Sequence, residues 1–307
     1  MIANNFERRF LGVDTGGGLL RLESNSFVEH EVDRIQLTSV GDLRMNGIRI
    51  LGPLEIEGSA GLPRLSSYRQ RAILARLALN ANGVTSMGSL VDATWDENPP
   101  MTARSQIQTG VSRLRRILAE SGCPASIETR PPGYRLIIRG GDLDSLHFAD
   151  LTNIARSQES KGRLIAALTT LKRALGIWRG SVLADVSSSR LQQAAYRLTE
   201  QRLSAQLSRF RIELELGRAV EITPDLYAHV EQHPLDEEIY RYLMLSLSMS
   251  GRSAEALKVF RQARKTLIER VGIEPSERLR RLEQAILRGD GELLRSMLSG
   301  LAMVGNK

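Results

Sequence analysis

Seven arginines and several short polar side chains gather between residues 101 and 140, where they could bind nucleic acid. This segment has two acids and a net charge of +5, whereas residues 45–100 carry five arginines and five acids. Guanidinium groups neutralise phosphates and donate paired hydrogen bonds to guanine, and hydroxyl and amide groups reach base edges and phosphates. The local charge therefore indicates a module that faces a phosphate backbone. The seven are Arg104, Arg113, Arg115, Arg116, Arg130, Arg135 and Arg139.

A helical period over residues 103–120 separates an apolar stripe from these polar residues. At about 100° per residue, the stripe occupies one side of the helix and must be buried. It consists of Ile107, Val111, Leu114 and Leu118. The far side carries the expected base and phosphate ligands, which are Ser105, Gln108, Thr109, Ser112, Arg113 and Arg116. Arg104 lies nearer the stripe, and we expect it to bind phosphate from the start of the helix.

Two alternating segments after this helix predict a hairpin. Residues 126–130 and 134–138 alternate as strands, and Pro131-Pro132-Gly133 separates them. We expect Arg130, near the hairpin tip, to reach the minor groove or its flanking phosphates. An ordinary surface helix and hairpin would have the same periodicity, so the charge distribution decides in favour of nucleic acid.

The segment before the basic helix completes a winged helix-turn-helix over residues 45–140. Alternating apolar residues between 46 and 56 predict a small antiparallel sheet, and helices are expected near 67–80 and 86–95. Strands, three helices and a terminal hairpin in this order are typical of that fold.

An acidic loop, residues 96–100, joins the second and third helices. Its acids and prolines are poor DNA ligands, so Asp96, Glu97 and Asn98 are candidates for contact with RNA polymerase. A spacer that sets the angle between two helices would have the same composition, and both readings remain open.

Beyond Gly140-Gly141-Asp142 the chain is predicted to be helical, with a domain over residues 145–290 and a C-terminal tail over 291–307. One helix is expected to end near Gly176, and a long one covers 188–216. The next is expected to start at Thr223-Pro224. A hairpin of helices and a last helix opening at Pro275-Ser276 suggest tetratricopeptide-like pairs. The arginines of the long helix could form a partner or second nucleic-acid surface, or a solvated face; they are Arg190, Arg197, Arg202 and Arg209.

Composition argues against several other classes. The chain has 307 residues, a net charge of +7 and one cysteine, Cys123, which leaves no intrachain disulfide and no cysteine-rich zinc site. His229 and His233 are spaced i, i+4 but have no evident third ligand, and no catalytic or nucleotide-binding motif occurs, so we expect no metal, cofactor or catalysis. Lacking an apolar leader or span, the protein is expected in the cytoplasm, away from membranes. Residues 1–44 are expected to be a flexible extension, with Met45 as an alternative start to Met1.

A series of ordered motifs runs along the chain from about residue 45 to residue 290. In the first half the motifs are Ile48-Arg49-Ile50-Leu51-Gly52-Pro53-Leu54, Arg69-Gln70-Arg71-Ala72, residues 90–95, the basic helix and residues 129–136. In the second half they are Trp178-Arg179-Gly180, Glu200-Gln201-Arg202-Leu203, His233-Pro234-Leu235, residues 243–257 and residues 271–276. In this order the motifs resemble those of the Streptomyces antibiotic regulatory proteins.

The resemblance implies a multidomain fold in which an OmpR/PhoB-type winged helix, which is α+β, precedes an all-α bacterial transcriptional activation domain. It implies an activator that binds direct repeats near promoters of secondary-metabolite gene clusters and recruits RNA polymerase holoenzyme, with a homodimer on the DNA as a further expectation. A rival reading is a helical scaffold or ligand sensor, in which residues 145–290 do the main work and the first module only localises it.

Overall fold

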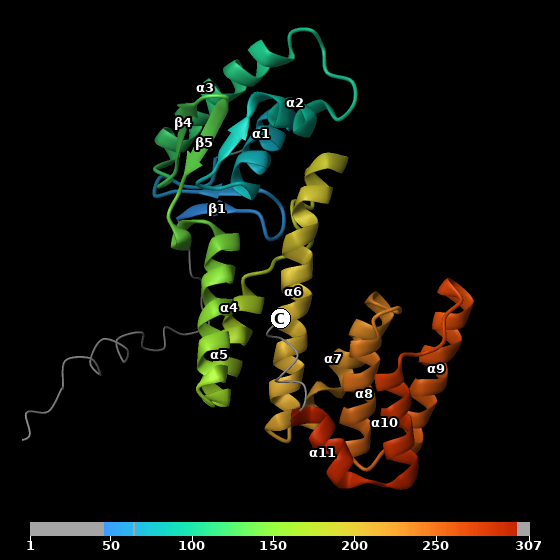
Figure 1. Cartoon of the computed structure of the whole chain (residues 1–307). Helices are drawn as coiled ribbons and strands as arrows, with labels where there is room; N and C mark the ends of the chain where they lie inside the picture. The colour runs from blue at the N-terminus through green and yellow to red at the C-terminus, as the bar shows by residue number, and fades with distance from the viewer. Residues whose placement is uncertain (1–45, 64, 300–307) are drawn as a thin grey trace, which may run out of the picture. The chain divides into compact units, whose positions relative to one another are not determined.

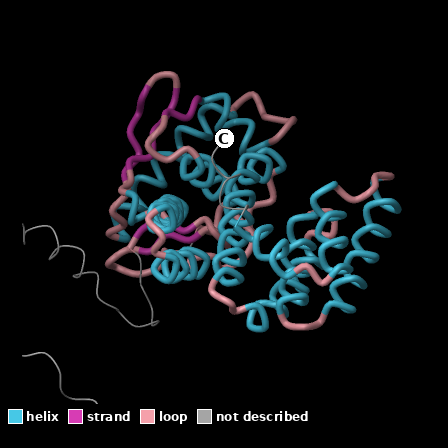
Figure 2. The backbone as a smooth tube through the Cα atoms, turned by 60° about the horizontal axis from the view of Figure 1, so that its bottom comes forward, coloured by secondary structure: helices cyan, strands magenta, loops and turns pink. Residues whose placement is uncertain are grey.

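The computed structural model describes residues 46–63 and 65–299, in which short strands are confined to the first part and helices make up the rest (Figures 1 and 2). The expected extension over residues 1–44, the choice of start codon and the end of the expected tail, residues 300–307, lie outside these ranges. Within them, no helix combines the length and the apolar character needed to cross a bilayer.

Strands β1 (Gly47–Arg49) and β2 (Glu55–Glu57) form the small antiparallel sheet that the alternation predicted. Ile48 lies opposite Ile56, and both side chains are buried. The chain between the strands, residues 50–54, contacts the second half of the protein.

Three helices follow, and each presents one apolar face to a common core. They are α1 (Tyr68–Leu79), α2 (Met87–Trp95) and α3 (Ala103–Ser121). Ile73 of α1, Leu90 of α2 and Leu114 of α3 are fully buried in that core. The order of strands and helices is that of a winged helix, as the sequence predicted.

The predicted hairpin of the wing is confirmed, and a third strand that was not expected pairs with it. Strands β4 (Ser126–Arg130) and β5 (Gly133–Ile137) pair as predicted, but β3 (Val84–Ser86) adds to the other edge of β5. A strand of three residues is too short to show a period of two. Gly133 permits the pairing, because a Cβ atom there would lie 2.0 Å from the carbonyl oxygen of Thr85.

The rest of the described chain is helical. After a short 3-10 turn, η1 (Gly140–Asp142), come the helices α4 (Asp144–Ser160), α5 (Leu164–Gly176), α6 (Ser189–Glu215), α7 (Ala219–Gln232), α8 (Glu237–Met249), α9 (Ser253–Val271), α10 (Glu277–Arg288) and α11 (Gly291–Ser299). The antiparallel pair α8 and α9 is the predicted helical hairpin, and α10 buries Leu279, Leu282 and Ile286 as expected.

Two details of this half differ from the sequence prediction. The helix expected to start at Thr223-Pro224 begins at Ala219 and contains Pro224 in its interior. Thr223 donates its hydroxyl hydrogen to the carbonyl oxygen of Ala219, so it bonds within the helix instead of capping it. The described part of the expected tail forms α11, whose Leu298 is buried in the neighbouring core.

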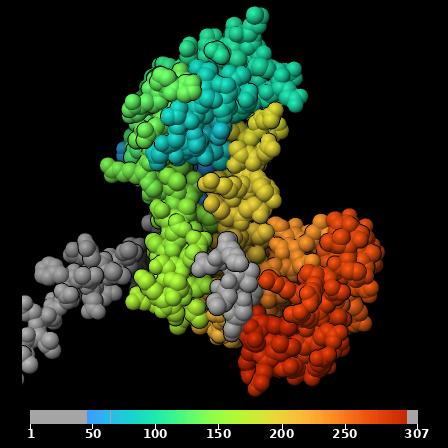
Figure 3. Space-filling view, viewed as in Figure 1, coloured from blue at the N-terminus to red at the C-terminus, as the bar shows by residue number. Residues whose placement is uncertain are grey.

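Two hydrophobic cores meet on α6. The first starts at Ile48, passes from the winged helix into α4 and α5, and ends at Ile212 of α6. The second starts at Phe210 and contains the buried faces of α7 to α10. The surface of α6, yellow in Figure 3, adjoins that of the winged helix in cyan. The first core therefore continues across residues 140–145, the segment at which Gly140-Gly141-Asp142 was expected to separate the two domains.

The carboxylate of Asp144, at the start of α4, joins the two halves. The backbone N–H of Ile50 lies 2.9 Å from both of its oxygens, and that of Leu51 lies 2.9 Å from Oδ2. Arg179 adds an ion pair to Glu55 at 2.7 Å and donates to the carbonyl oxygen of Pro53 at 3.0 Å. Asp144 is only 1 % exposed, so its charge depends on these partners.

We expect Asp144→Asn to lower the free energy of unfolding by about 2–3 kcal/mol, because an amide nitrogen would face N–H donors that now bind a buried carboxylate. Urea denaturation followed by circular dichroism measures the change. Asp150→Asn, an exposed position on the same helix, is the matched control and should shift stability by less than about 0.5 kcal/mol. Equal midpoints for the two variants would contradict this role of Asp144.

Candidate nucleic-acid interface

Helix α3 is anchored by the stripe that the sequence predicted. Ile107, Val111, Leu114 and Leu118 are each at most 1 % exposed. Gly110 extends this face and lets α3 approach α1 closely, because a Cβ atom there would lie 2.6 Å from Cδ1 of Ile73. The rotation of the helix about its axis is thereby determined, and so is the set of side chains that point outward.

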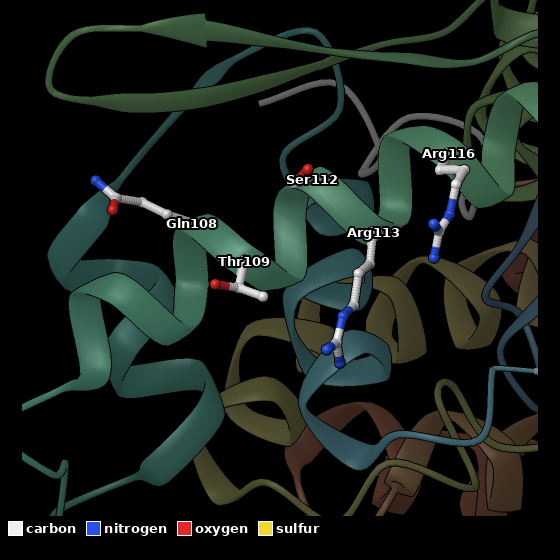
Figure 4. Close-up of a pocket in the computed structure, with 5 residues that line it drawn as sticks. All are labelled: Gln108, Thr109, Ser112, Arg113 and Arg116. Atoms are coloured by element: carbon white, nitrogen blue, oxygen red, sulfur yellow. The ribbon is translucent and has the colours of Figure 1, made fainter.

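The outward side carries every predicted ligand of the helix. Arg104, Ser105, Gln108, Thr109, Ser112, Arg113 and Arg116 are all exposed. The last five of them line a shallow open hollow along the helix (Figure 4). In that view Arg113 and Arg116 extend from the same side of α3. No acid occurs in the first turn, where unpaired backbone N–H groups favour an anion.

The polar side chains on this face differ in whether their hydrogen-bond donors are already used within the protein. Ser105 donates to the carbonyl oxygen of Thr102 at 2.9 Å, and Thr109 donates to that of Ser105 at 3.0 Å. These two hydroxyls therefore offer a ligand mainly their lone pairs. Gln108 and Ser112 have no hydrogen bond to another described residue, so their donors and acceptors are free.

The arginines of α3 divide into free and engaged groups. Among the described residues, Arg104 and Arg113 have neither a hydrogen bond nor an ion pair, and Arg116 lies 3.9 Å from Glu120 across the solvated helix surface. Such a long, exposed pair holds a guanidinium weakly. These three charges are available to phosphates or bases.

Arg115 serves the fold instead of the outward face. Its Nε donates to the carbonyl oxygen of Ile127 at 2.8 Å and its Nη2 to the hydroxyl of Thr129 at 2.9 Å, both on β4. The guanidinium also lies 5.8 Å from the ring centroid of Tyr134 on β5. Arg115 thus ties the wing to α3, a role that periodicity could not indicate because it depends on a contact between distant residues.

On the wing itself, Arg130 is exposed and forms an ion pair with Glu128 on the same strand, with 3.1 Å between Nε and Oε2. Both side chains are largely solvated, so the pair opposes a phosphate contact only weakly.

In the loop expected to touch polymerase, the side chain of Asp96 is hydrogen-bonded, whereas those of Glu97 and Asn98 have no partner among the described residues. Oδ1 of Asp96 accepts hydrogen bonds from the hydroxyls of Ser188 and Ser189 and from the backbone N–H of Arg190, at 3.2, 3.0 and 3.3 Å. Sequence reasoning missed this role, since the partners are more than ninety residues away. Glu97 and Asn98 are exposed.

The four arginines of α6 do not form one surface. Arg202 lies 4.8 Å over the ring of Trp178, and Arg209 pairs with Asp225 at 2.6 Å. Arg190 and Arg197 remain exposed. Half of this predicted set is therefore used in packing within the helical half.

The histidine pair is a helix-end feature in the structure. Nδ1 of His229 lies 2.8 Å from the carbonyl oxygen of Asp225, and its ring meets that of Phe210 edge to face. The pKa of His229 lies below its ordinary value, mainly because burial disfavours the charged imidazolium. Across the part of the chain that the structure describes, no group of three or more potential metal ligands occurs.

Both halves match known families. Residues 64–136 match the family described as "Transcriptional regulatory protein, C terminal", and residues 143–287 match "Bacterial transcriptional activator domain".

Individual proteins are similar over most of the chain. The regulatory protein DnrI of Streptomyces peucetius is 33% identical, with 79% of this chain and 92% of DnrI covered. The regulatory protein AfsR of Streptomyces coelicolor is 36% identical over 80% of this chain. The chain spans about a quarter of the length of AfsR, with 24% covered. Among solved structures, Mycobacterium tuberculosis EmbR in complex with a low affinity phosphopeptide has a TM-score of 0.77 and 30% identity, covering 84% of this chain and 70% of that one.

We expect Arg115→Ala to lower the free energy of unfolding by about 1–2 kcal/mol, because two hydrogen bonds and a cation–π contact are lost. Arg113→Ala, two positions away and without a partner among the described residues, is the control and should change stability by less than about 0.5 kcal/mol. Thermal unfolding of the two purified variants makes the comparison. A melting temperature of Arg115→Ala equal to that of the control would show that the wing does not depend on this contact.

Proposed function

The chain belongs to the Streptomyces antibiotic regulatory protein family of transcriptional regulators, and from that premise we propose that it is a sequence-specific, DNA-binding activator. The observation that carries the proposal is the outward face of α3, where free arginines and amide and hydroxyl groups lie side by side above a buried aliphatic stripe. A helix of this kind fits the major groove.

Each side chain has a distinct part in this mechanism. Arg113 and Arg116 bind guanine or phosphate, and Gln108 and Ser112 read base edges at shorter range, with Ser105 and Thr109 accepting hydrogen bonds. Arg104 binds phosphate from the helix start. Arg130 reaches the minor groove or its flanking phosphates once Arg115 has set the distance between wing and helix.

We propose that it binds direct repeats near promoters of a secondary-metabolite gene cluster, as a homodimer on DNA, and recruits RNA polymerase holoenzyme in the cytoplasm. The family membership and the similarity to the regulatory protein DnrI, of which 92% is covered, support this reading. The loop residues Glu97 and Asn98 contact polymerase, and Asp96 belongs to the same loop.

Arg113→Ala and Arg116→Ala are expected to weaken binding in one of two distinguishable ways. Loss of a base contact costs about 1–3 kcal/mol on the cognate site and relaxes preference at one position. Loss of a phosphate contact weakens all sequences alike and reduces the salt slope of log K by about one. Fluorescence anisotropy on cognate and scrambled duplexes, at several salt concentrations, separates these outcomes.

Arg278→Ala, an exposed arginine on α10, is the matched control and should leave binding unchanged. If Arg113→Ala and Arg116→Ala behave like this control on both duplexes, α3 is not the reading element.

The double variant Glu97→Ala/Asn98→Ala should retain DNA affinity and lose transcription from the target promoter, because the loop lies outside the DNA-contacting set. Anisotropy and in vitro transcription with purified holoenzyme measure the two quantities. Glu231→Ala, an exposed acid on α7, serves as the control. Full transcription by the double variant would leave the loop as a spacer.

A further inference from the structure

The loop between α2 and α3 begins at a residue with an unusual backbone conformation. Asp96, the residue that ends α2, has φ 50° and ψ −110°, a region that non-glycine residues rarely adopt. Such a conformation persists only where surrounding contacts hold it. The next residues include Pro99 and Pro100, which stiffen the chain and transmit the direction taken at Asp96.

The contacts that hold Asp96 come from the start of α6. Its Oδ1 accepts hydrogen bonds from Ser188, Ser189 and the N–H of Arg190. Ser188 is itself the N-cap of α6, because its hydroxyl oxygen also accepts from the N–H of Leu191 at 3.4 Å. One carboxylate therefore stabilises the beginning of α6 and the strained end of α2 together.

Neighbouring contacts keep this segment against the winged helix. The hydroxyl of Tyr68 donates to the carbonyl oxygen of Ser187 at 3.2 Å. Asp185 accepts from the N–H of Leu54 at 2.8 Å and forms an ion pair with Arg71. Figure 1 shows the first turns of α6 beside α2, in keeping with their contacts. The start of α6 is thus a fixed point to which the loop is attached.

Glu97 and Asn98, the two residues that follow Asp96, are exposed to solvent. The backbone restrains them lightly, through one bond from the N–H of Asn98 to the carbonyl oxygen of Trp95 at 3.2 Å. Removal from water raises the pKa of Asp96, but the bonds from Arg190 and the two serines outweigh this and hold the pKa below its ordinary value. The carboxylate is therefore charged near neutral pH, and the attachment is present there.

We propose that Asp96 is a positioning residue: by binding the first turn of α6, it holds the loop of residues 96–100 in one conformation and so presents Glu97 and Asn98 to polymerase. This inference rests on the proposed function and deepens it, since it assigns the helical half a direct part in shaping the surface used for activation. Without the bond, Asp96 relaxes to an ordinary φ and the two exposed side chains lose their common direction.

The test compares variants at both ends of the contact in the full chain. Asp96→Gly removes the carboxylate and accommodates the positive φ, so it releases the loop without adding strain. Ser188→Ala removes a donor that is only 1 % exposed and therefore cannot touch polymerase itself. Hydrogen exchange at the Asn98 amide, anisotropy on promoter DNA and in vitro transcription are measured for each.

Both variants are expected to accelerate exchange at Asn98 by about tenfold or more, to keep DNA affinity within about twofold, and to reduce transcription severalfold. Ser188→Thr, which retains the hydroxyl, should restore both exchange protection and transcription. Ser187→Ala is the matched control, because Ser187 lies in the same serine run but its hydroxyl forms no hydrogen bond to a described residue. This variant should behave as the unaltered protein. Circular dichroism verifies that each variant is folded.

Unchanged exchange in Asp96→Gly and Ser188→Ala would overturn the positioning role. Faster exchange with full transcription in either variant would also overturn it, because the loop conformation would then not matter for activation. Failure of the proposed function has a different signature: promoter DNA is not bound, or Glu97→Ala/Asn98→Ala transcribes normally, while the exchange results at Asn98 stand.

Discussion

A buried carboxylate between two segments far apart in sequence is the constraint on which the rest of the structure depends. Ile50 and Leu51 directly follow the first strand and are buried, so water cannot accept hydrogen bonds from their backbone N–H groups. The carboxylate of Asp144 accepts these hydrogen bonds instead. The parallel bridge between Ile48 and Leu143 brings the start of α4 to this place. The winged helix is thereby joined to the helical half through its own backbone, and a shared core closes around the junction.

Helix α6 extends this connection to the second core. Its first turn binds Asp96, and further along it contributes Ile212 to one core and Phe210 to the other. Between the cores lie charged residues that are almost fully buried, among them Arg211, which pairs with Glu159 at 2.5 Å. Breaking such a pair leaves an uncompensated buried charge, which is costly. A displacement of α6 would therefore be resisted at both ends, and the loop at Asp96 inherits that rigidity.

The sequence predicted what periodicity and local charge encode. The stripe on α3 and the exposed ligands opposite it follow from a period of 3.6 residues, and the hairpin follows from alternation and Pro131-Pro132-Gly133. The third wing strand was not predicted because a segment of three residues is too short to show a period of two. The early start of α7 was not predicted because Pro224 was read as a helix start. In the structure Ala219 and Ile222, which precede Pro224, are buried in the second core, and this packing favours helix before the proline.

What sequence could not resolve was which charges are free. Arg113 and Arg115 are two positions apart on one helix. Arg115 donates hydrogen bonds to Ile127 and Thr129, whereas Arg113 has no partner among the described residues. Likewise, Asp96 accepts hydrogen bonds from α6 whereas its neighbour Glu97 is exposed, and Arg202 packs on Trp178 whereas Arg197 is exposed. Composition counts all of these charges alike. A charged side chain that is bonded within the fold positions neighbouring elements, whereas one without such a partner can bind a ligand. The bonded side chains must therefore be identified before the remaining ones can be assigned to a binding site.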